Sequence, residues 1–131
     1  MYLREYSPKD YPMLARWWQA HGWPGVSQAI LPKLGLILED NGAPVVAGFV
    51  YMDNSVGVAF LEWVVGSPNA SGKQIVAGIG HLIEFACRRV KEMGYGVLLT
   101  ACKQDALVRL YEKNGFEKTD DGLTHLVKIL K

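Results

Sequence analysis

The sequence predicts a single α/β (α+β) domain, residues 1–131, with a mixed, mostly antiparallel sheet of about six to seven strands and helices on both faces. Half of the residues are hydrophobic and 21% are charged, enough apolar surface for one buried core in a chain of this length. More segments have the residue pattern of a strand than have apolar residues at helical spacing. The longest helical stretch stands between strands, an order that packs most simply as a sheet covered on both sides.

The first half of the chain contains most of the expected strands. Ser7 followed by Pro8 is a typical helix start, and Asn41-Gly42 between two apolar runs is a typical hairpin turn. We expect strands over 2–6, 34–40, 43–52 and 56–66, a helix over 9–21, and a short helix or turn over 26–31.

The second half begins with the longest helical pattern. Ser71 with Gln74 three residues later predicts a capping box at its start, and Gly94 ends it. The elements expected after it are a strand over 95–101, a helix that Gly115 ends, and strands over 116–119 and 123–130. Because the first of these strands is apolar throughout, we expect it to be buried on both faces.

The charge balance and the cysteines limit the class of protein. Lys and Arg number 14 and Asp and Glu 13, a net charge of +1 with no basic run, so we expect no nucleic-acid partner. Charges interrupt every apolar run, and no signal-peptide core opens the sequence, so we expect no membrane association. Cys87 and Cys102 lack metal-ligand spacing, so we expect no metal site, and reduced cysteines favour the cytoplasm.

Tyr111 stands near the end of the last helical pattern, four residues before Gly115. Leu107, Leu110 and Tyr111 have the spacing of one helix face. The spacing is typical of a core aromatic residue whose hydroxyl lies at the rim of the core. Spacing alone assigns this tyrosine no chemical role.

Glu62 interrupts an otherwise apolar strand. Alternation places Val58, Phe60, Glu62 and Val64 on one face. A carboxylate there is unfavourable unless it is paired, hydrated or functional. The sequence leaves open whether a cation on a neighbouring element pairs with Glu62 or whether it takes part in chemistry.

Three tryptophans and a histidine, Trp17, Trp18, His21 and Trp23, lie within seven residues. They are suited to lining a cleft or a protein-binding surface. The alternative is that at least one of Trp17 and Trp18 faces the core and that His21 caps the helix. We interpret His81 and His125 as structural, because neither has an evident partner in the sequence.

The segment "LYEKNGF" at residues 110–116 resembles the "LYEKLGF" signature of the GNAT superfamily of N-acetyltransferases, and the order of elements matches that family across the whole chain. The chain also resembles the small single-domain GNAT-like proteins of bacteria and phages. The resemblance implies acetyl-CoA as acyl donor, Tyr111 as general acid to the departing thiolate, and Glu62 as general base to the amine. It also implies that pantetheine bonds to the backbone of the strand around Glu62, at Trp63, Val64, Val65 and Gly66.

The loop that holds the CoA pyrophosphate in this family has the pattern (Gln/Arg)-x-x-Gly-x-(Gly/Ala), and the sequence departs from it. A motif at residues 75–80 matches Gly78 and Gly80 but lacks the leading Gln or Arg, and helical spacing places it inside a helix. We therefore prefer a loop at residues 69–74. The cofactor-binding residues that this implies are Asn69, Ser71, Gly72, Lys73 and Gln74, with Gln104 where the family often has asparagine.

Two functions of different classes follow. The first is an N-acetyltransferase that moves an acetyl group from acetyl-CoA to a primary amine of a small molecule or a protein by direct attack. The second is a catalytically silent GNAT-fold module that recognises a protein partner, which the altered loop favours. A CoA-binding sensor without turnover is a third, weaker alternative. A homodimer is compatible with the resemblance, because sheet pairing between protomers is common in the family.

Overall fold

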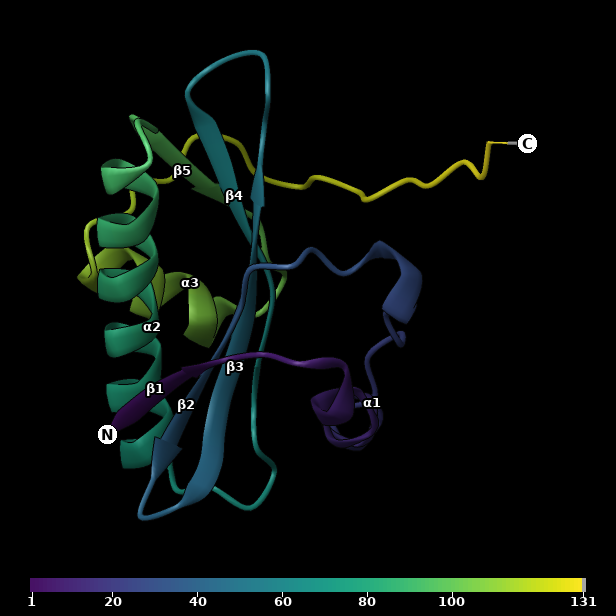
Figure 1. Ribbon diagram of the computed structural model, residues 1–131, viewed down its shortest axis with the longest axis vertical. Coiled ribbons are helices and arrows are strands. Elements are labelled where there is room, and N and C mark those ends of the chain that lie inside the picture. The colour runs from purple at the N-terminus through teal and green to yellow at the C-terminus, as the bar shows by residue number, and fades with distance from the viewer. Residues whose placement is uncertain (131) are drawn as a thin grey trace.

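A five-stranded sheet forms the centre of the molecule, with helices on both faces (Figure 1). The computed structural model describes residues 1–130. The strands are β1 (Tyr2–Glu5), β2 (Gly35–Asp40), β3 (Ala43–Met52), β4 (Val58–Gly66) and β5 (Val97–Thr100). The helices are α1 (Tyr11–Ala20), α2 (Gly72–Glu92) and α3 (Asp105–Lys113), with 3-10 turns η1 (Pro8–Asp10) and η2 (Gln28–Ile30).

The strands lie in sequence order, and only the last pair is parallel. β1, β2, β3 and β4 pair antiparallel with their neighbours, and β4 pairs parallel with β5. Asn41 and Gly42 both have positive φ, 52° and 80°, as a two-residue hairpin turn requires. Helix α2 forms the crossover between the two parallel strands. The prediction of a mixed, mostly antiparallel sheet between helices is confirmed.

Each face of the sheet carries its own apolar core. Helices α2 and α3 pack on one face and α1 on the other (Figure 1). The α2 side includes Leu36, Leu61, Ile79, Leu82, Ala86 and Tyr111. The α1 side includes Leu14, Trp17, Trp18, Ile37, Phe49 and Val65. Both tryptophans of α1 are therefore core residues, which confirms the core interpretation for that pair.

Helix α2 lies very close to the sheet at Gly78. A Cβ atom on Gly78 would stand 2.8 Å from Val46 Cγ2 on β3, so only glycine allows this approach. At Gly80 an added Cβ would meet only Asn114 Oδ1, at 3.5 Å. Because both glycines lie inside α2, the alternative loop at residues 75–80 is excluded.

The two strands expected at residues 116–119 and 123–130 do not form, and the sheet has five strands instead of the expected six to seven. Phe116 packs against the α2-side core, but the charged and polar residues that follow it are exposed. A strand is stabilised by cross-strand pairs and a buried face, and this segment has neither. The chain instead crosses behind β4 and extends away from the body (Figure 1).

The expectation that residues 95–101 are buried on both faces is also wrong. β5 is an edge strand, and Val97 and Leu99 are 48% and 44% exposed. Of the β5 residues, only Leu98 packs in the α2-side core, because within residues 1–130 no element with a core covers the opposite face of β5.

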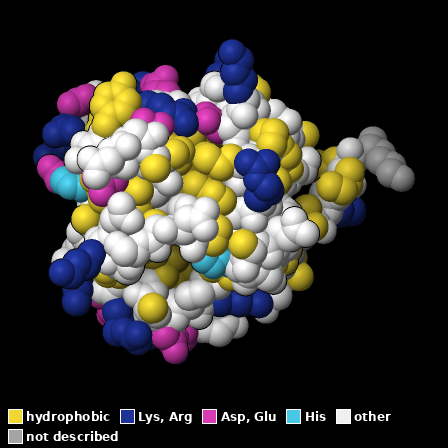
Figure 2. Space-filling view, turned by 90° about the horizontal axis from the view of Figure 1, so that it is seen from below, with side chains coloured by type: hydrophobic (Ala, Val, Ile, Leu, Met, Phe, Trp, Pro, Cys, Tyr) yellow, Lys and Arg dark blue, Asp and Glu magenta, His cyan; other side chains and the backbone are white. Residues whose placement is uncertain are grey.

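The surface is mixed in charge. Viewed from below, acidic and basic side chains are interspersed, and hydrophobic atoms show in the hollows between them (Figure 2). Within residues 1–130, no helix has the length and apolarity to cross a membrane.

Candidate functional site

A β-bulge in β4 brings Glu62 and Trp63 to the same face of the sheet. The register between β3 and β4 shifts between Ala47 and Phe49, and Trp63 has φ of 59°. Left-handed backbone is unusual for a bulky residue and marks a site where the fold imposes strain. The extra residue reverses the alternation, so Val64 packs in the α2-side core. The expectation that Val64 shares a face with Glu62 is therefore wrong.

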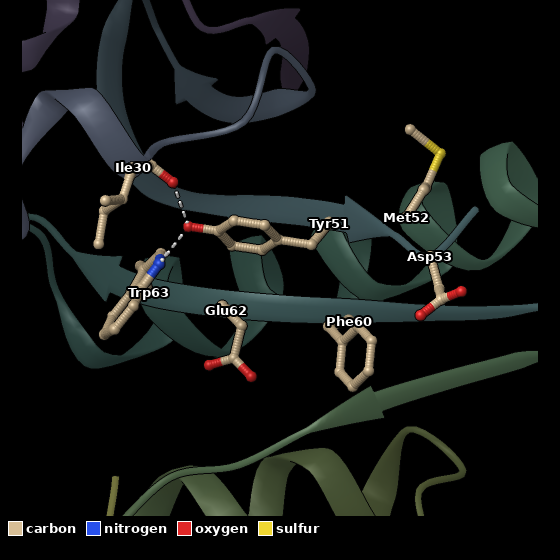
Figure 3. A pocket seen from close by; sticks show the side chains of 7 residues that line it. All are labelled: Ile30, Tyr51, Met52, Asp53, Phe60, Glu62 and Trp63. Atoms are coloured by element: carbon tan, nitrogen blue, oxygen red, sulfur yellow. Dashed lines mark hydrogen bonds between the residues drawn. The ribbon is translucent and has the colours of Figure 1, made fainter. Parts of the chain in front are cut away.

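The face that the bulge creates contains a shallow cavity of about 520 Å³ (Figure 3). The residues that line it are Ile30, Tyr51, Met52, Asp53, Phe60, Glu62 and Trp63. They come from η2, from the end of β3 with the turn that follows it, and from β4. We call it the aromatic pocket, because three rings form its wall.

Tyr51 fixes the inner end of the aromatic pocket. Its hydroxyl donates to Ile30 O at 2.7 Å and accepts from Trp63 Nε1 at 2.8 Å. Figure 3 shows both bonds converging on the same oxygen. The two bonds hold the Trp63 indole in one orientation despite the strained backbone beneath it.

Glu62 points into the pocket without a partner. Among residues 1–130, no cation or hydrogen-bond donor lies within bonding distance of its carboxylate. The salt-bridge alternative is therefore not realised in the described part of the chain. Burial raises the pKa of Glu62, and His125 lowers it in part. A carboxylate with a raised pKa and free lone pairs has the properties of a general base.

His125 lies beside this carboxylate, on the segment that crosses β4. Its ring stands edge-on to Trp63, with centroids 6.1 Å apart and an interplanar angle of 78°. No pattern in the sequence indicates that residue 125 lies at this site, because the contact depends on how the C-terminal segment runs after α3.

The open edge of β4 begins next to Glu62. The β4–β5 ladder ends at Leu61 and Thr100, and Thr100 Oγ1 donates to Leu61 O at 2.7 Å. β4 continues to Gly66 with no β5 partner beside it. Unpaired strand backbone can bond to an extended ligand. This is the arrangement that the resemblance implies for Trp63, Val64, Val65 and Gly66.

The Tyr111 side chain lies on the α2 side of the sheet, near Thr100 at the end of the β4–β5 ladder. It lies on α3, is 4% exposed, and its ring packs 5.2 Å from the Phe116 ring. Gly115, at φ of 95°, ends the helix so that Phe116 can turn back onto Tyr111. Burial raises the pKa of the Tyr111 phenol, and the nearby Thr100 hydroxyl offsets this in part.

Cys102 is a further residue at this point, to which the sequence assigns no role at the site. Its thiol donates to Gln104 O at 3.9 Å, at the start of α3. Burial raises the pKa of the Cys102 thiol, and the Glu62 carboxylate adds to the rise. Its position directly after a predicted strand was the only available signal.

The start of α2 has the expected capping box. Ser71 Oγ accepts from Gln74 N at 3.2 Å, and Gln74 Oε1 accepts from Ser71 N at 2.9 Å. Gln74 Nε2 also donates to Asp40 Oδ2 at 3.0 Å, so this side chain secures the helix to β2. The loop is shorter than expected, because Gly72, Lys73 and Gln74 already belong to the helix.

Two backbone groups at this helix start are free to bind an anion. Of the first three N–H groups of the helix, the Ser71 side chain bonds only to that of Gln74. The N–H groups of Gly72 and Lys73 have no bonding partner within residues 1–130. They stand at the positive end of a 21-residue helix, with the Lys73 side chain beside them. Asn69 N is already bonded to Ser67 Oγ at 3.2 Å.

The remaining candidate residues lie around this centre. His21 Nε2 bonds to Gly66 O at 2.9 Å and its ring stacks on Trp23 at 4.6 Å. These contacts join the end of α1 to the open end of β4. Gln104 is the exposed N-cap residue of α3, and its side chain makes no capping bond.

Comparisons with known proteins agree on the fold. No family model and no curated protein matches the sequence. Among solved structures, the ribosomal-protein-S18-alanine N-acetyltransferase of Escherichia coli is similar with a TM-score of 0.71 and 19% identity, covering 91% of this chain and 79% of that one. An aminoglycoside 6′-N-acetyltransferase of Acinetobacter haemolyticus is similar with a TM-score of 0.63 and 16% identity, covering 98% and 99%.

A transcriptional regulator of Bacillus halodurans is also similar, with a TM-score of 0.71 and 18% identity, covering 96% of this chain and 99% of that one. At these identities the likeness concerns the fold alone. The chain has the GNAT N-acetyltransferase fold.

Proposed function

We propose that this protein is an N-acetyltransferase that moves an acetyl group from acetyl-CoA to a primary amine by direct attack. One observation carries the proposal: an unpaired carboxylate and a buried phenol, Glu62 and Tyr111, lie on opposite faces of the sheet near the point where the β4–β5 ladder ends. The acetyltransferases among the structural neighbours support the same reaction class.

The residues present fit acetyl-CoA. The edge of β4 from Glu62 to Val65, which no β5 residue pairs with, suits an extended pantetheine arm, which carries amides that can bond to a strand edge. The free N–H groups of Gly72 and Lys73 suit a phosphate. When bound, acetyl-CoA supplies a thioester carbonyl that an amine can attack.

Two side chains then handle protons. Glu62 accepts a proton from the amine nitrogen, which restores the lone pair needed for attack, and its raised pKa makes it a stronger base than an exposed carboxylate. The Tyr111 hydroxyl stays protonated at neutral pH, because burial raises its pKa. As the thioester bond breaks, it donates its proton to the leaving sulfur, which departs as the thiol, and solvent returns a proton to the phenolate.

Calorimetric titration of acetyl-CoA into the protein at moderate salt tests the first requirement. We expect micromolar binding, followed by release of free CoA thiol when an amine acceptor is added. An acceptor screen would include both small-molecule amines and protein amino groups. No binding at millimolar acetyl-CoA would overturn the proposal and favour a catalytically silent module that recognises a protein partner.

A further inference from the structure

We propose that the acceptor of this enzyme is a small primary amine with a single positive charge and an aromatic or hydrocarbon body. This inference rests on the proposed function, since it names the substrate class of the same site. Three features of the aromatic pocket support the inference separately: its aromatic wall, the hydrogen bonds that already engage its polar groups, and its charge.

The pocket wall is aromatic beside the base. Phe60 and Glu62 project from the same face of β4, and Trp63 joins them because of the bulge (Figure 3). With Tyr51 on β3, three rings surround one carboxylate. Aromatic faces attract an ammonium group and bury an apolar body, so this wall favours a ligand with both.

The pocket has almost no free polar groups for the body of a ligand. The Tyr51 hydroxyl and the Trp63 indole N–H bond to each other, and the hydroxyl also bonds to Ile30 O. Asp53 Oδ1 accepts from the backbone of Ser55 and Val56 at 2.6 and 3.1 Å, within its own turn. Hydroxyl or amide groups of a sugar or a peptide that face the rings would lose hydrogen bonds to water without replacement, which disfavours both.

The charge of the pocket suits one ammonium group. Its lining contains no Lys or Arg, and no salt bridge within residues 1–130 engages either of its carboxylates, Glu62 and Asp53. A second ammonium on the ligand would find only Asp53 Oδ2, because Oδ1 accepts from its own turn, and at this exposed turn water screens a charge pair so that it adds little. The pocket therefore matches a monocation better than a polycation.

The chain itself presents a comparable group at this place. The imidazole of His125, a flat aromatic ring, lies edge-on to Trp63. It shows that a flat ring is accommodated at the edge of this wall.

The test compares acceptors that differ in one property. Phenethylamine, glucosamine and putrescine are supplied with acetyl-CoA, and CoA thiol release gives kcat/KM for each. We expect phenethylamine to exceed both of the others by about 30-fold or more. Phe60→Ser should reduce that preference about tenfold, whereas Val56→Ser, an exposed turn residue outside the pocket, should leave it unchanged.

A binding measurement separates this inference from the proposed function. Saturation-transfer NMR detects contact between phenethylamine and the protein, with CoA present, whether or not an acetyl group is transferred. Binding that Phe60→Ser weakens, without turnover of any amine, would overturn the acetyltransferase and keep the ligand class. Turnover of glucosamine or putrescine at rates equal to phenethylamine would overturn the ligand class and keep the acetyltransferase. Neither binding nor turnover would overturn both.

Discussion

At the scale of single residues, the chemistry of Glu62 depends on its neighbours rather than on its own type. The bulge turns Trp63 to the same face, and the two side chains share one pocket. Removal of water by these apolar neighbours raises the pKa of the carboxyl group. The same desolvation makes the charged form unfavourable for the folded state.

Substitution of Glu62 tests both consequences. If Glu62 is the base, Glu62→Gln should lower kcat about 100-fold or more and remove the acidic limb of the pH profile of kcat/KM. In the native protein this limb should lie above the range of an ordinary glutamate, because the pKa is raised. A limb that persists at the same pH in the variant would assign the base to another group.

The same variant makes a prediction about stability that needs no substrate. Because the folded state binds the Glu62 proton more tightly than the unfolded state, stability falls as pH rises from the unfolded pKa through the folded one. Glu62→Gln should therefore raise Tm relative to the native protein at pH 7 but not at about pH 4. Equal shifts at both pH values would contradict burial of an unpaired charge.

The ring of Tyr111 packs in the core and its hydroxyl is the proposed acid, and one substitution separates these two roles. Tyr111→Phe keeps the ring that packs on Phe116 and removes only the hydroxyl. We expect kcat to fall about 100-fold while acetyl-CoA affinity, measured by calorimetry, changes little. An unaltered kcat would reduce Tyr111 to a core residue, the role that helical spacing alone indicates.

At the scale of elements, helix α2 combines close packing with the helix start at which we propose that phosphate binds. Gly78→Ala should destabilise the fold by about 1–3 kcal/mol, because the new methyl group would overlap Val46 on β3. Gly80→Ala, two residues further on, should stabilise it by about 0.5–1 kcal/mol, since the space is open and alanine is the better helix former. Urea titration of both variants measures the contrast. Equal effects would mean that α2 does not approach β3 at Gly78.

The start of the same helix should respond to charge. Lys73→Ala is expected to weaken acetyl-CoA binding about two- to fivefold at low salt, the usual effect of one charge at a helix end. Lys91→Ala, in the last turn of α2, is the matched control and should leave binding unchanged. Calorimetry at two salt concentrations measures both variants. If Lys91→Ala weakened binding as much, the phosphates would not lie at the N-terminal end.

Sequence patterns predicted those elements whose signals are local. The capping box at Ser71 and the hairpin at Asn41 each depend on residues a few positions apart, and both are present. The bulge at Trp63 has no such signal, because it arises from the pairing of two strands. For that reason the face of Val64 was assigned wrongly, and the aromatic pocket was not foreseen. The contact of His125 with this pocket was missed for the same kind of reason.

At the scale of the whole molecule, the C-terminal segment contributes little to the folded body. Leu126 and Leu130 are 92% and 84% exposed, and no hydrogen bond joins residues 123–130 to the rest of the described chain. The ring contact of His125 with Trp63 is modest in energy. Stability therefore resides in the two cores between residues 1 and 116.

Removal of residues 123–131 tests whether the stability of the fold resides in the two cores. We expect Tm to change by less than about 3 °C, because a loss of 1 kcal/mol or less shifts a domain of this size by only a few degrees. A variant that keeps the segment but carries His125→Ala is the control for the single ring contact. A large fall in Tm on truncation, with no change for His125→Ala, would mean that the segment pairs with the free edge of β5, either in its own protomer or in a second copy. Sedimentation of the full chain distinguishes those two arrangements, because only pairing with a second copy doubles the mass.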